Sequence, residues 1–86
     1  MKKIIKLEAD WCVPCKRFAP VIKRVCDEMN IELISLDVEK DHEKILEYGL
    51  SAMSLPTIFF MRDNKVISHK FGTMSEYEIK HEIDKL

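Results

Sequence analysis

The sequence predicts a three-layer α/β domain in which helices cover a four-stranded mixed sheet. Four segments have the length and apolar pattern of strands, three have apolar residues at helical spacing, and they alternate as strand, helix, strand, helix, strand, strand, helix. The first two strands should run parallel through a right-handed crossover, and the last two should form a hairpin. With 86 residues there is room for one compact unit, so residues 1–86 are expected to form a single domain.

The first strand is expected at residues 3–8. Side chains alternate along a strand, so Ile5 and Leu7 fall on one face and Lys6 and Glu8 on the other. A strand of this kind packs its apolar face into the core.

A turn then leads into the first helix. Apolar side chains recur along it at helical spacing: Cys15, Phe18, Ile22, Val25, Cys26 and Met29. Pro14 lies in the first turn, where a missing N–H costs little, and Pro20 lies inside the helix, where a kink is expected. Asn30 is the expected end of the helix.

Residues 31–38 are rich in Ile, Leu and Val and predict the second strand. Asp41 is expected to cap a short helix that runs to about Tyr48, with Gly49 as its terminator. A loop is expected at Leu50–Leu55.

Residues 57–61 are continuously apolar, as in a strand that is covered on both faces. A tight turn at residues 62–65 and an antiparallel strand at residues 66–71 should follow, and Gly72 ends that strand. The segment Ser75–Glu78 matches a capping box and predicts the start of the last helix.

Composition excludes several classes of function. Fourteen basic side chains oppose fifteen acidic ones, for a formal net charge of −1, which disfavours binding to nucleic acid. No stretch is long and apolar enough to span a membrane, and charged residues interrupt the N-terminal apolar run before it could act as a secretory signal. Three cysteines, an odd number, argue against a secreted disulfide scaffold. A cytoplasmic location is the expectation.

The reactive residues are concentrated at residues 11–16, Trp-Cys-Val-Pro-Cys-Lys, where the first strand passes into the first helix. Two cysteines three positions apart in a first helical turn face the same side and can close a disulfide. The unpaired N–H groups and the positive dipole end of the helix favour the thiolate form of Cys12. We therefore expect Cys12 to attack a substrate disulfide, and the less exposed Cys15 to resolve the mixed disulfide.

Residues 11–16 resemble the active site of the thioredoxin family, whose usual form is Trp-Cys-Gly-Pro-Cys-Lys. Pro20 lies where that family has the proline that kinks the active-site helix. Leu55-Pro56-Thr57 resembles the family's cis-proline segment, and Phe71-Gly72 resembles the glycine site that closes its substrate groove. The resemblance covers essentially the whole chain without the family's usual first strand and helix, as in its minimal, glutaredoxin-sized members. It implies the thioredoxin fold.

The resemblance also implies how substrates bind. The Leu55–Pro56 bond would be cis, and the backbone of Leu55 would be free to pair with an extended substrate strand. The apolar surface that contacts the substrate would comprise six residues: Trp11, Val13, Pro14, Leu55, Pro56 and Gly72.

Partners follow from the same resemblance. Disulfide-containing proteins are the expected substrates, with ribonucleotide reductase as a reasonable client. Glutathione-dependent members usually have Thr-Val-Pro at the cis-proline and a Gly-Gly plus Asp pair near the last helix, whereas residues 54–56 and 72–75 read Ser-Leu-Pro and Gly-Thr-Met-Ser. This difference favours a thioredoxin reductase as the electron donor. A monomer is expected, with no cofactor and no metal.

Lys6 is a departure from the family, because it stands where the family has a buried aspartate beneath the second cysteine. A charged lysine near the thiols would stabilise thiolate and make the couple more oxidising. Alternatively, Lys6 extends to solvent beside Glu8, which could itself take the place of the aspartate. Both interpretations stay open at this point.

Several other functions fit the sequence less well than that of a reductase. A zinc site would need two further ligands beside Cys12 and Cys15, and no second pair follows. Cys26 fits a buried apolar residue better than a regulatory thiol. A glutaredoxin-like, glutathione-coupled oxidoreductase remains an alternative, as does a non-catalytic binding module, although the latter would not require both cysteines. An oxidase or isomerase is disfavoured, but Lys6 keeps it open.

Overall fold

The seven elements follow one another in the order that the sequence predicts. A computed structural model describes all 86 residues, with these elements: β1 (Lys2–Glu8), α1 (Val13–Met29), β2 (Glu32–Asp37), α2 (His42–Glu47), β3 (Thr57–Arg62), β4 (Lys65–Phe71) and α3 (Glu76–Asp84). The four strands form one sheet in the order β2-β1-β3-β4. β1 is parallel to β2 and antiparallel to β3, and β3 and β4 form an antiparallel hairpin. The predicted mixed sheet is confirmed, with its parallel first pair of strands and its final hairpin.

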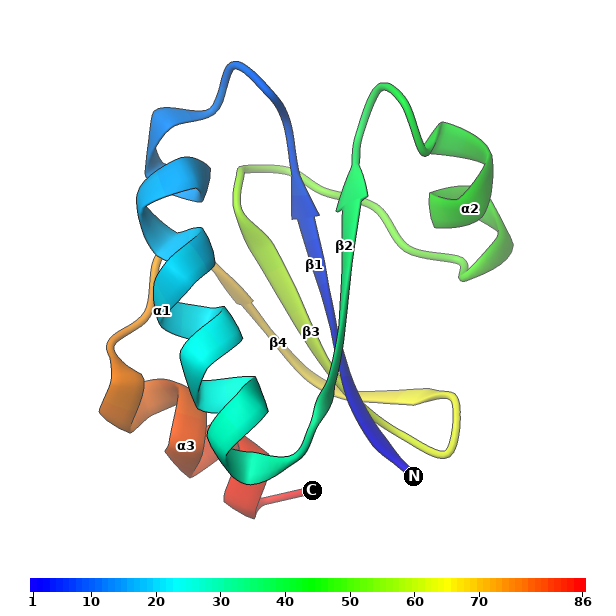
Figure 1. The fold of residues 1–86 in the computed structure, drawn as a ribbon. Helices are drawn as coiled ribbons and strands as arrows, with labels where there is room; N and C mark the ends of the chain where they lie inside the picture. Colours follow the sequence, from blue (N-terminus) through cyan, green and yellow to red (C-terminus); the bar gives the residue numbers. More distant parts are fainter.

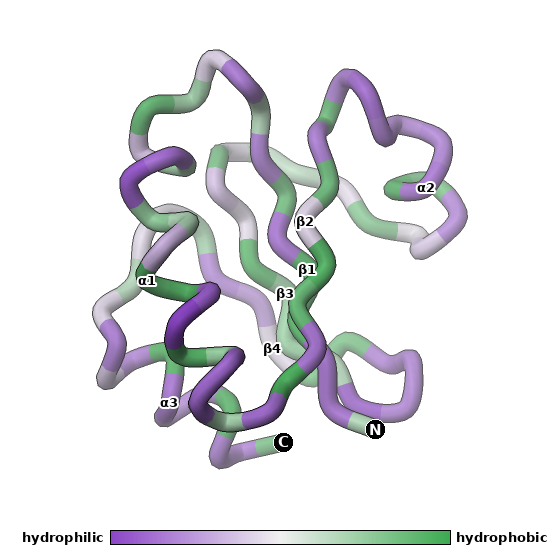
Figure 2. The backbone as a smooth tube through the Cα atoms, in the orientation of Figure 1, coloured by the Kyte–Doolittle hydropathy of each residue, from purple (hydrophilic) through white to green (hydrophobic).

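Helices lie on both faces of the sheet, as Figure 1 shows: α1 and α3 on one face and α2 on the other. The core on the first face is the larger one: Ile4, Phe18, Ile22, Val25, Cys26, Ile58, Phe60, Met74, Ile79, Ile83 and Leu86. The second core is smaller: Ile5, Leu7, Leu36, Ile45, Leu50, Phe59 and Met61. β3 contributes to both cores, so the prediction that it is covered on both faces is confirmed. Residues of β3 are mostly hydrophobic, whereas the turn between β3 and β4 is hydrophilic (Figure 2).

The ends of α1 and α3 follow the predicted capping chemistry. Asn30, at the C-terminus of α1, adopts a left-handed conformation with φ of 56°. At the start of α3, Ser75 Oγ accepts a hydrogen bond from the N–H of Glu78 at 3.1 Å. The Glu78 carboxylate accepts one from the N–H of Ser75 at 3.0 Å, which completes the capping box.

The predicted cap of α2 is wrong in its chemistry. Asp41 occupies the N-cap position, but its side chain makes no capping hydrogen bond. Its carboxylate instead accepts the N–H of Asp37, at 2.8 Å, because the turn after β2 brings that donor within reach. The expected terminator, Gly49, does adopt a left-handed conformation, with φ of 71°.

The turn between β3 and β4 is tight, as predicted. Asp63 and Asn64 both have positive φ, 52° and 66°, the conformation that the twist of a two-residue hairpin requires. A bulge follows, since Met61 pairs with Val66 but Phe60 pairs with Ser68. None of the three helices has the length and apolar run required to cross a membrane.

A buried carboxylate ties α3 to β4. The side chain of Glu82 is almost fully buried, and its two oxygens lie 3.3 Å from the Lys70 ammonium and 3.1 Å from that of Lys85. Burial opposes the ionised form of Glu82, but the ammonium groups of Lys85 and Lys70 outweigh it and hold the pKa of this carboxyl below its ordinary value. Unfolding restores the ordinary pKa, so the charged form of Glu82 stabilises the fold.

We predict that Glu82→Gln removes part of the acid sensitivity of the fold. Because the pKa of Glu82 is lower in the folded state, its contribution is complete above the ordinary glutamate value of about 4.3 and is lost as pH falls through the folded value. Denaturant unfolding at a series of pH values should therefore show a shallower acid loss in Glu82→Gln than in the native chain. The control is Glu43→Gln, at an exposed residue without an ion pair, which should leave the slope unchanged. Equal slopes in all three proteins contradict the prediction.

Candidate active site

Cys12 is the N-cap residue of α1, and Cys15 lies in the first turn of that helix. Cys12 has extended backbone angles, φ of −88° and ψ of 101°, and its Sγ atom accepts a hydrogen bond from the N–H of Cys15 at 3.2 Å. The two cysteines form a disulfide, with their Cα atoms 5.3 Å apart. Pro14 lies between them in the first turn and has no N–H that would need a partner there. The sulfur atom of Cys12 therefore takes the place that a capping oxygen usually occupies.

Both cysteines are buried, with 5% of Cys12 and 2% of Cys15 exposed. Cys12, and not Cys15, lines the cavity beside the disulfide. Cys15 packs inward with Ala9, and Val38 and Leu55 lie against this small cluster. The two sulfur atoms therefore differ in access, and Cys12 is the one that an incoming molecule can meet.

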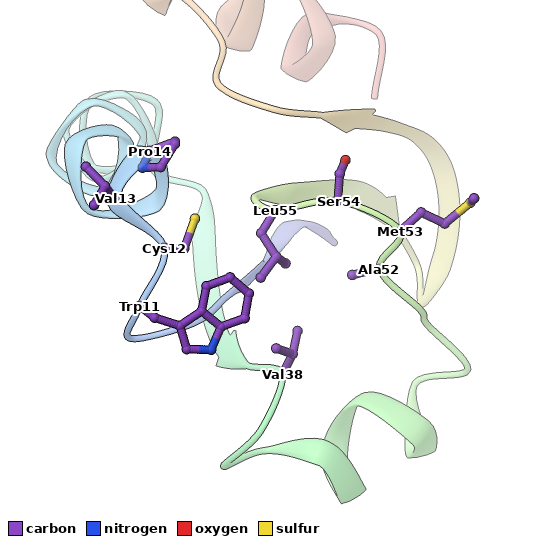
Figure 3. A pocket seen from close by; sticks show the side chains of 9 residues that line it. All are labelled: Trp11, Cys12, Val13, Pro14, Val38, Ala52, Met53, Ser54 and Leu55. Atoms are coloured by element: carbon purple, nitrogen blue, oxygen red, sulfur yellow. The ribbon is translucent and has the colours of Figure 1, made fainter.

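The cavity beside Cys12 is apolar and has a volume of about 700 Å³. Nine residues line it, none of them charged: Trp11, Cys12, Val13, Pro14, Val38, Ala52, Met53, Ser54 and Leu55. They come from the start of α1, the end of β2 and the loop before β3, and the rings and methyl groups of Trp11, Val38 and Leu55 gather at its centre (Figure 3). Four lining residues were not among the contact residues expected from the sequence: Val38, Ala52, Met53 and Ser54. The position of Val38 could have been predicted from the sequence. The predicted first and second strands are parallel neighbours, so the residues that follow them, Cys12 and Val38 among them, emerge at the same edge of the sheet.

Trp11 is held in place although its side chain is largely exposed, at 66%. Its indole Nε1 donates a hydrogen bond to the Glu39 carboxylate at 2.7 Å. Glu39 is fixed in turn, because its own N–H and that of Lys40 donate to the carboxylate of Asp37 at 2.8 and 3.0 Å. These two backbone donors, Lys40 first, hold the pKa of Asp37 below its ordinary value. The loop after β2 therefore orients the ring that stands beside the disulfide.

The segment around Pro56 lies behind the cavity. The Leu55–Pro56 bond is cis, as the resemblance implied. Neither the N–H nor the C=O of Leu55 has a hydrogen-bond partner, and its side chain lines the cavity. Pro56 itself is buried, and its C=O accepts the N–H of Gly72 at 2.8 Å, where Gly72 has φ of 84°. Of the six expected contact residues, Pro56 and Gly72 do not line this cavity.

Lys6 does not reach solvent, so the interpretation that its side chain extends into water is wrong. Only 2% of that side chain is exposed, because α1 covers this face of β1. Its ammonium lies 2.9 Å from the carboxylate of Glu8, which is 32% exposed. The buried ammonium of Lys6 therefore lies beneath α1, and its one ion-pair partner, Glu8, is partly exposed.

Cys26 is separate from the Cys12–Cys15 disulfide, and no metal-binding group forms around that disulfide. No third His, Asp, Glu or Cys joins Cys12 and Cys15 in a group that could hold a metal ion. Cys26 is buried in the first core, where burial and the neighbouring charge of Asp27 raise the pKa of its thiol to about 11. This agrees with the expectation that Cys26 is a packing residue.

The chain resembles known proteins over nearly its whole length. The family model for thioredoxin matches residues 1–85. The thioredoxin of Bacillus subtilis is 30% identical over 79 residues, which cover 90% of this chain and 74% of that protein. The thioredoxin of Mycoplasmoides gallisepticum is 30% identical over 80 residues, 92% of this chain and 78% of that protein. In three dimensions, a thioredoxin of Fasciola hepatica matches with a TM-score of 0.82 and 25% identity, over 98% of this chain and 79% of that one.

We predict that Cys26 resists alkylation in the folded protein. At neutral pH a thiol with a pKa of about 11 is almost entirely protonated, and burial blocks access as well. Iodoacetamide should therefore modify Cys26 at least about a hundredfold more slowly in the folded, reduced chain than in denaturant, as followed by mass spectrometry of peptides. The variant Cys26→Ala identifies the signal that belongs to this thiol. Similar rates in the two conditions contradict its assignment as a packing residue.

Proposed function

Because the chain belongs to the thioredoxin family, we propose that Cys12 attacks disulfides of other proteins and that Cys15 releases the reduced products. Family, fold and a cysteine pair at disulfide distance make the chain a thiol–disulfide oxidoreductase that reduces protein disulfides. The observation that carries the assignment of roles is the position of Cys12, whose Sγ accepts the N–H of Cys15 at the helix N-terminus and lines the apolar cavity.

The reaction follows from this geometry. In the reduced chain, the helix N-terminus and the N–H of Cys15 stabilise negative charge on Cys12 Sγ. The thiolate attacks one sulfur of a substrate disulfide, and the other sulfur leaves as a thiolate that takes up a proton. Cys15 loses its proton and attacks Cys12 Sγ, which breaks the mixed disulfide and expels the second substrate thiol. The substrate gains two electrons, and the chain is left with the Cys12–Cys15 disulfide.

The substrate is held beside Cys12 by backbone and by apolar contact. The free N–H and C=O of Leu55 can pair with an extended substrate strand, a form of strand addition. Trp11, Val13 and Pro14 then border the strand, because they line the cavity from the other side. Pro56 and Gly72, joined by their hydrogen bond, act from behind by fixing the position of Leu55.

Thioredoxins act on disulfide-containing substrates and are reduced by thioredoxin reductase. For this chain the same donor is the proposal, since residues 54–56 and 72–75 lack the residues typical of glutathione-dependent members. Ribonucleotide reductase is a reasonable client. A reducing compartment such as the cytoplasm suits a dithiol that must be returned to its reduced form.

Lys6 belongs to the same proposal as a positioning residue. Its buried ammonium faces α1, the helix that carries Cys15 and Cys26. Burial and Asp27 raise the pKa of Cys26, and the charge of Lys6 opposes them in part. A positive charge beneath this helix favours thiolate in the reduced chain and makes the couple more oxidising. The carboxylate of Glu8, 2.9 Å from the ammonium, opposes this effect in part.

The roles of the two cysteines predict different trapped species. Cys15→Ser retains the attacking thiol but cannot resolve, so incubation with a disulfide-linked peptide should accumulate a mixed disulfide on Cys12, seen by mass spectrometry. Cys12→Ser should form none under the same conditions. The matched control Cys26→Ser should turn over like the native chain. A mixed disulfide on Cys15 in Cys12→Ser, with none in Cys15→Ser, would reverse the roles.

The ion pair of Lys6 and Glu8 predicts potential shifts of opposite sign. Lys6→Met removes a cation at similar volume, so the couple should become more reducing by about 15 mV or more, equivalent to about a threefold change in its equilibrium with glutathione. Glu8→Gln should make it more oxidising, because the ammonium then acts unopposed. Equilibration with glutathione buffers measures both, with unfolding curves to confirm that the variants are folded. Shifts in the same direction, or none, contradict this role.

A further inference from the structure

We propose that the preferred substrate segment carries an apolar side chain on one side of its reactive cysteine and an acidic side chain on the other, which Arg17 binds. This inference rests on the proposed function and specifies its substrate. The inference is drawn from a second cavity, next to the one at Cys12. Among the residues that line the two cavities, Arg17 of this second cavity is the only charged one.

The second cavity has a volume of about 330 Å³ and lies between α1 and the segment that joins β4 to α3. Six residues line it: Pro14, Arg17, Phe18, Val21, Thr73 and Met74. Pro14 lines both cavities, so they adjoin at the start of α1. A strand that crosses the helix N-terminus at Cys12 can therefore reach both. Successive side chains of an extended segment point to opposite faces, so the residues two positions before and two positions after the cysteine share its face. One peptide can therefore place these two side chains in the two cavities while its cysteine meets Cys12.

Charge distinguishes the two cavities. The first has no charged lining residue, whereas Arg17 is the single charged residue in the second. The guanidinium of Arg17 makes no hydrogen bond and no ion pair in the structure. The next two basic residues of α1 are both paired, Lys23 with Asp27 and Arg24 with Glu76. Arg17 is thus an unpaired cation in the cavity that adjoins the one at Cys12.

The chemistry of Arg17 favours a carboxylate as its partner. A guanidinium presents paired N–H donors that match the two oxygens of a carboxylate, and the hydroxyl of Thr73 offers a further donor across the cavity. The apolar neighbours Phe18 and Met74 suit the methylene groups of an aspartate or glutamate side chain. A glutamine would keep the shape but lose the charge, and a lysine would be repelled.

The test uses single-turnover reduction of model peptides by the pre-reduced chain, so that no electron donor is required. Each peptide has one cysteine in a disulfide with 2-thiopyridine, a neutral leaving group whose release is followed by absorbance. A leucine stands two positions from the cysteine on one side, and glutamate, glutamine or lysine stands two positions from it on the other, in both orders. In one of the two orders the glutamate peptide should react about two- to fivefold faster than the glutamine peptide, as an exposed ion pair allows, and the advantage should shrink with added salt.

Three variants separate a specific contact from general attraction. Arg17→Gln should abolish the glutamate-to-glutamine rate ratio, and Arg17→Glu should transfer the preference to the lysine peptide. The matched control is Lys16→Gln, which removes the neighbouring basic residue, also exposed, that lines neither cavity and should keep the ratio. Because each ratio compares two peptides on one protein, a change in the reactivity of Cys12 cancels.

The possible failures are distinguishable. If no peptide releases thiopyridone, the proposed reductase function fails together with this inference. If all peptides react but glutamate and glutamine do so equally, or if Lys16→Gln and Arg17→Gln lower the ratio alike, the Arg17 site is overturned and the reductase stands.

Discussion

Hydrogen bonding of β1 along both of its edges is the constraint on which the site depends. Its register with β2 sets Glu8 opposite Asp37, and the N–H of Val38 donates to the C=O of Glu8 at 2.8 Å. The two chain segments that leave these strands therefore emerge side by side, one carrying Cys12 and the other carrying Val38. The antiparallel partner β3 brings the residues that precede it to the same edge of the sheet. An apolar cavity thus forms from three segments that are far apart in the sequence.

A second constraint is the buried charge at Lys6. Removing an ammonium from water costs several kcal/mol unless a partner and hydrogen bonds compensate, and here one carboxylate supplies that compensation. Such a pair adds little to stability compared with an apolar pair of similar size. The proposed effect of Lys6 on the thiols therefore does not compete with a large contribution of this pair to stability.

Most of the fold could be predicted from local patterns, because strand alternation, the capping box and the left-handed residues after α1 and α2 are encoded in short segments. The disulfide between Cys12 and Cys15 could be predicted because its two cysteines lie in one helical turn. What could not be predicted depends on tertiary contact. Asp41 caps nothing because Asp37 offers its N–H instead. The burial of Lys6 is decided by the helix packed over it, and the second cavity exists only once the segment before α3 lies beside Arg17.

Trp11 gives the molecule a property that its chemistry does not require. It is the single tryptophan of the chain, and its ring lines the same cavity as Cys12. Indole emission responds to the polarity of its surroundings and to nearby quenching groups, and a disulfide is such a group. The tryptophan fluorescence of the whole protein therefore comes from the cavity beside Cys12 alone. Opening the disulfide or filling the cavity changes that fluorescence, so redox state and occupancy can be read in the native chain without a label.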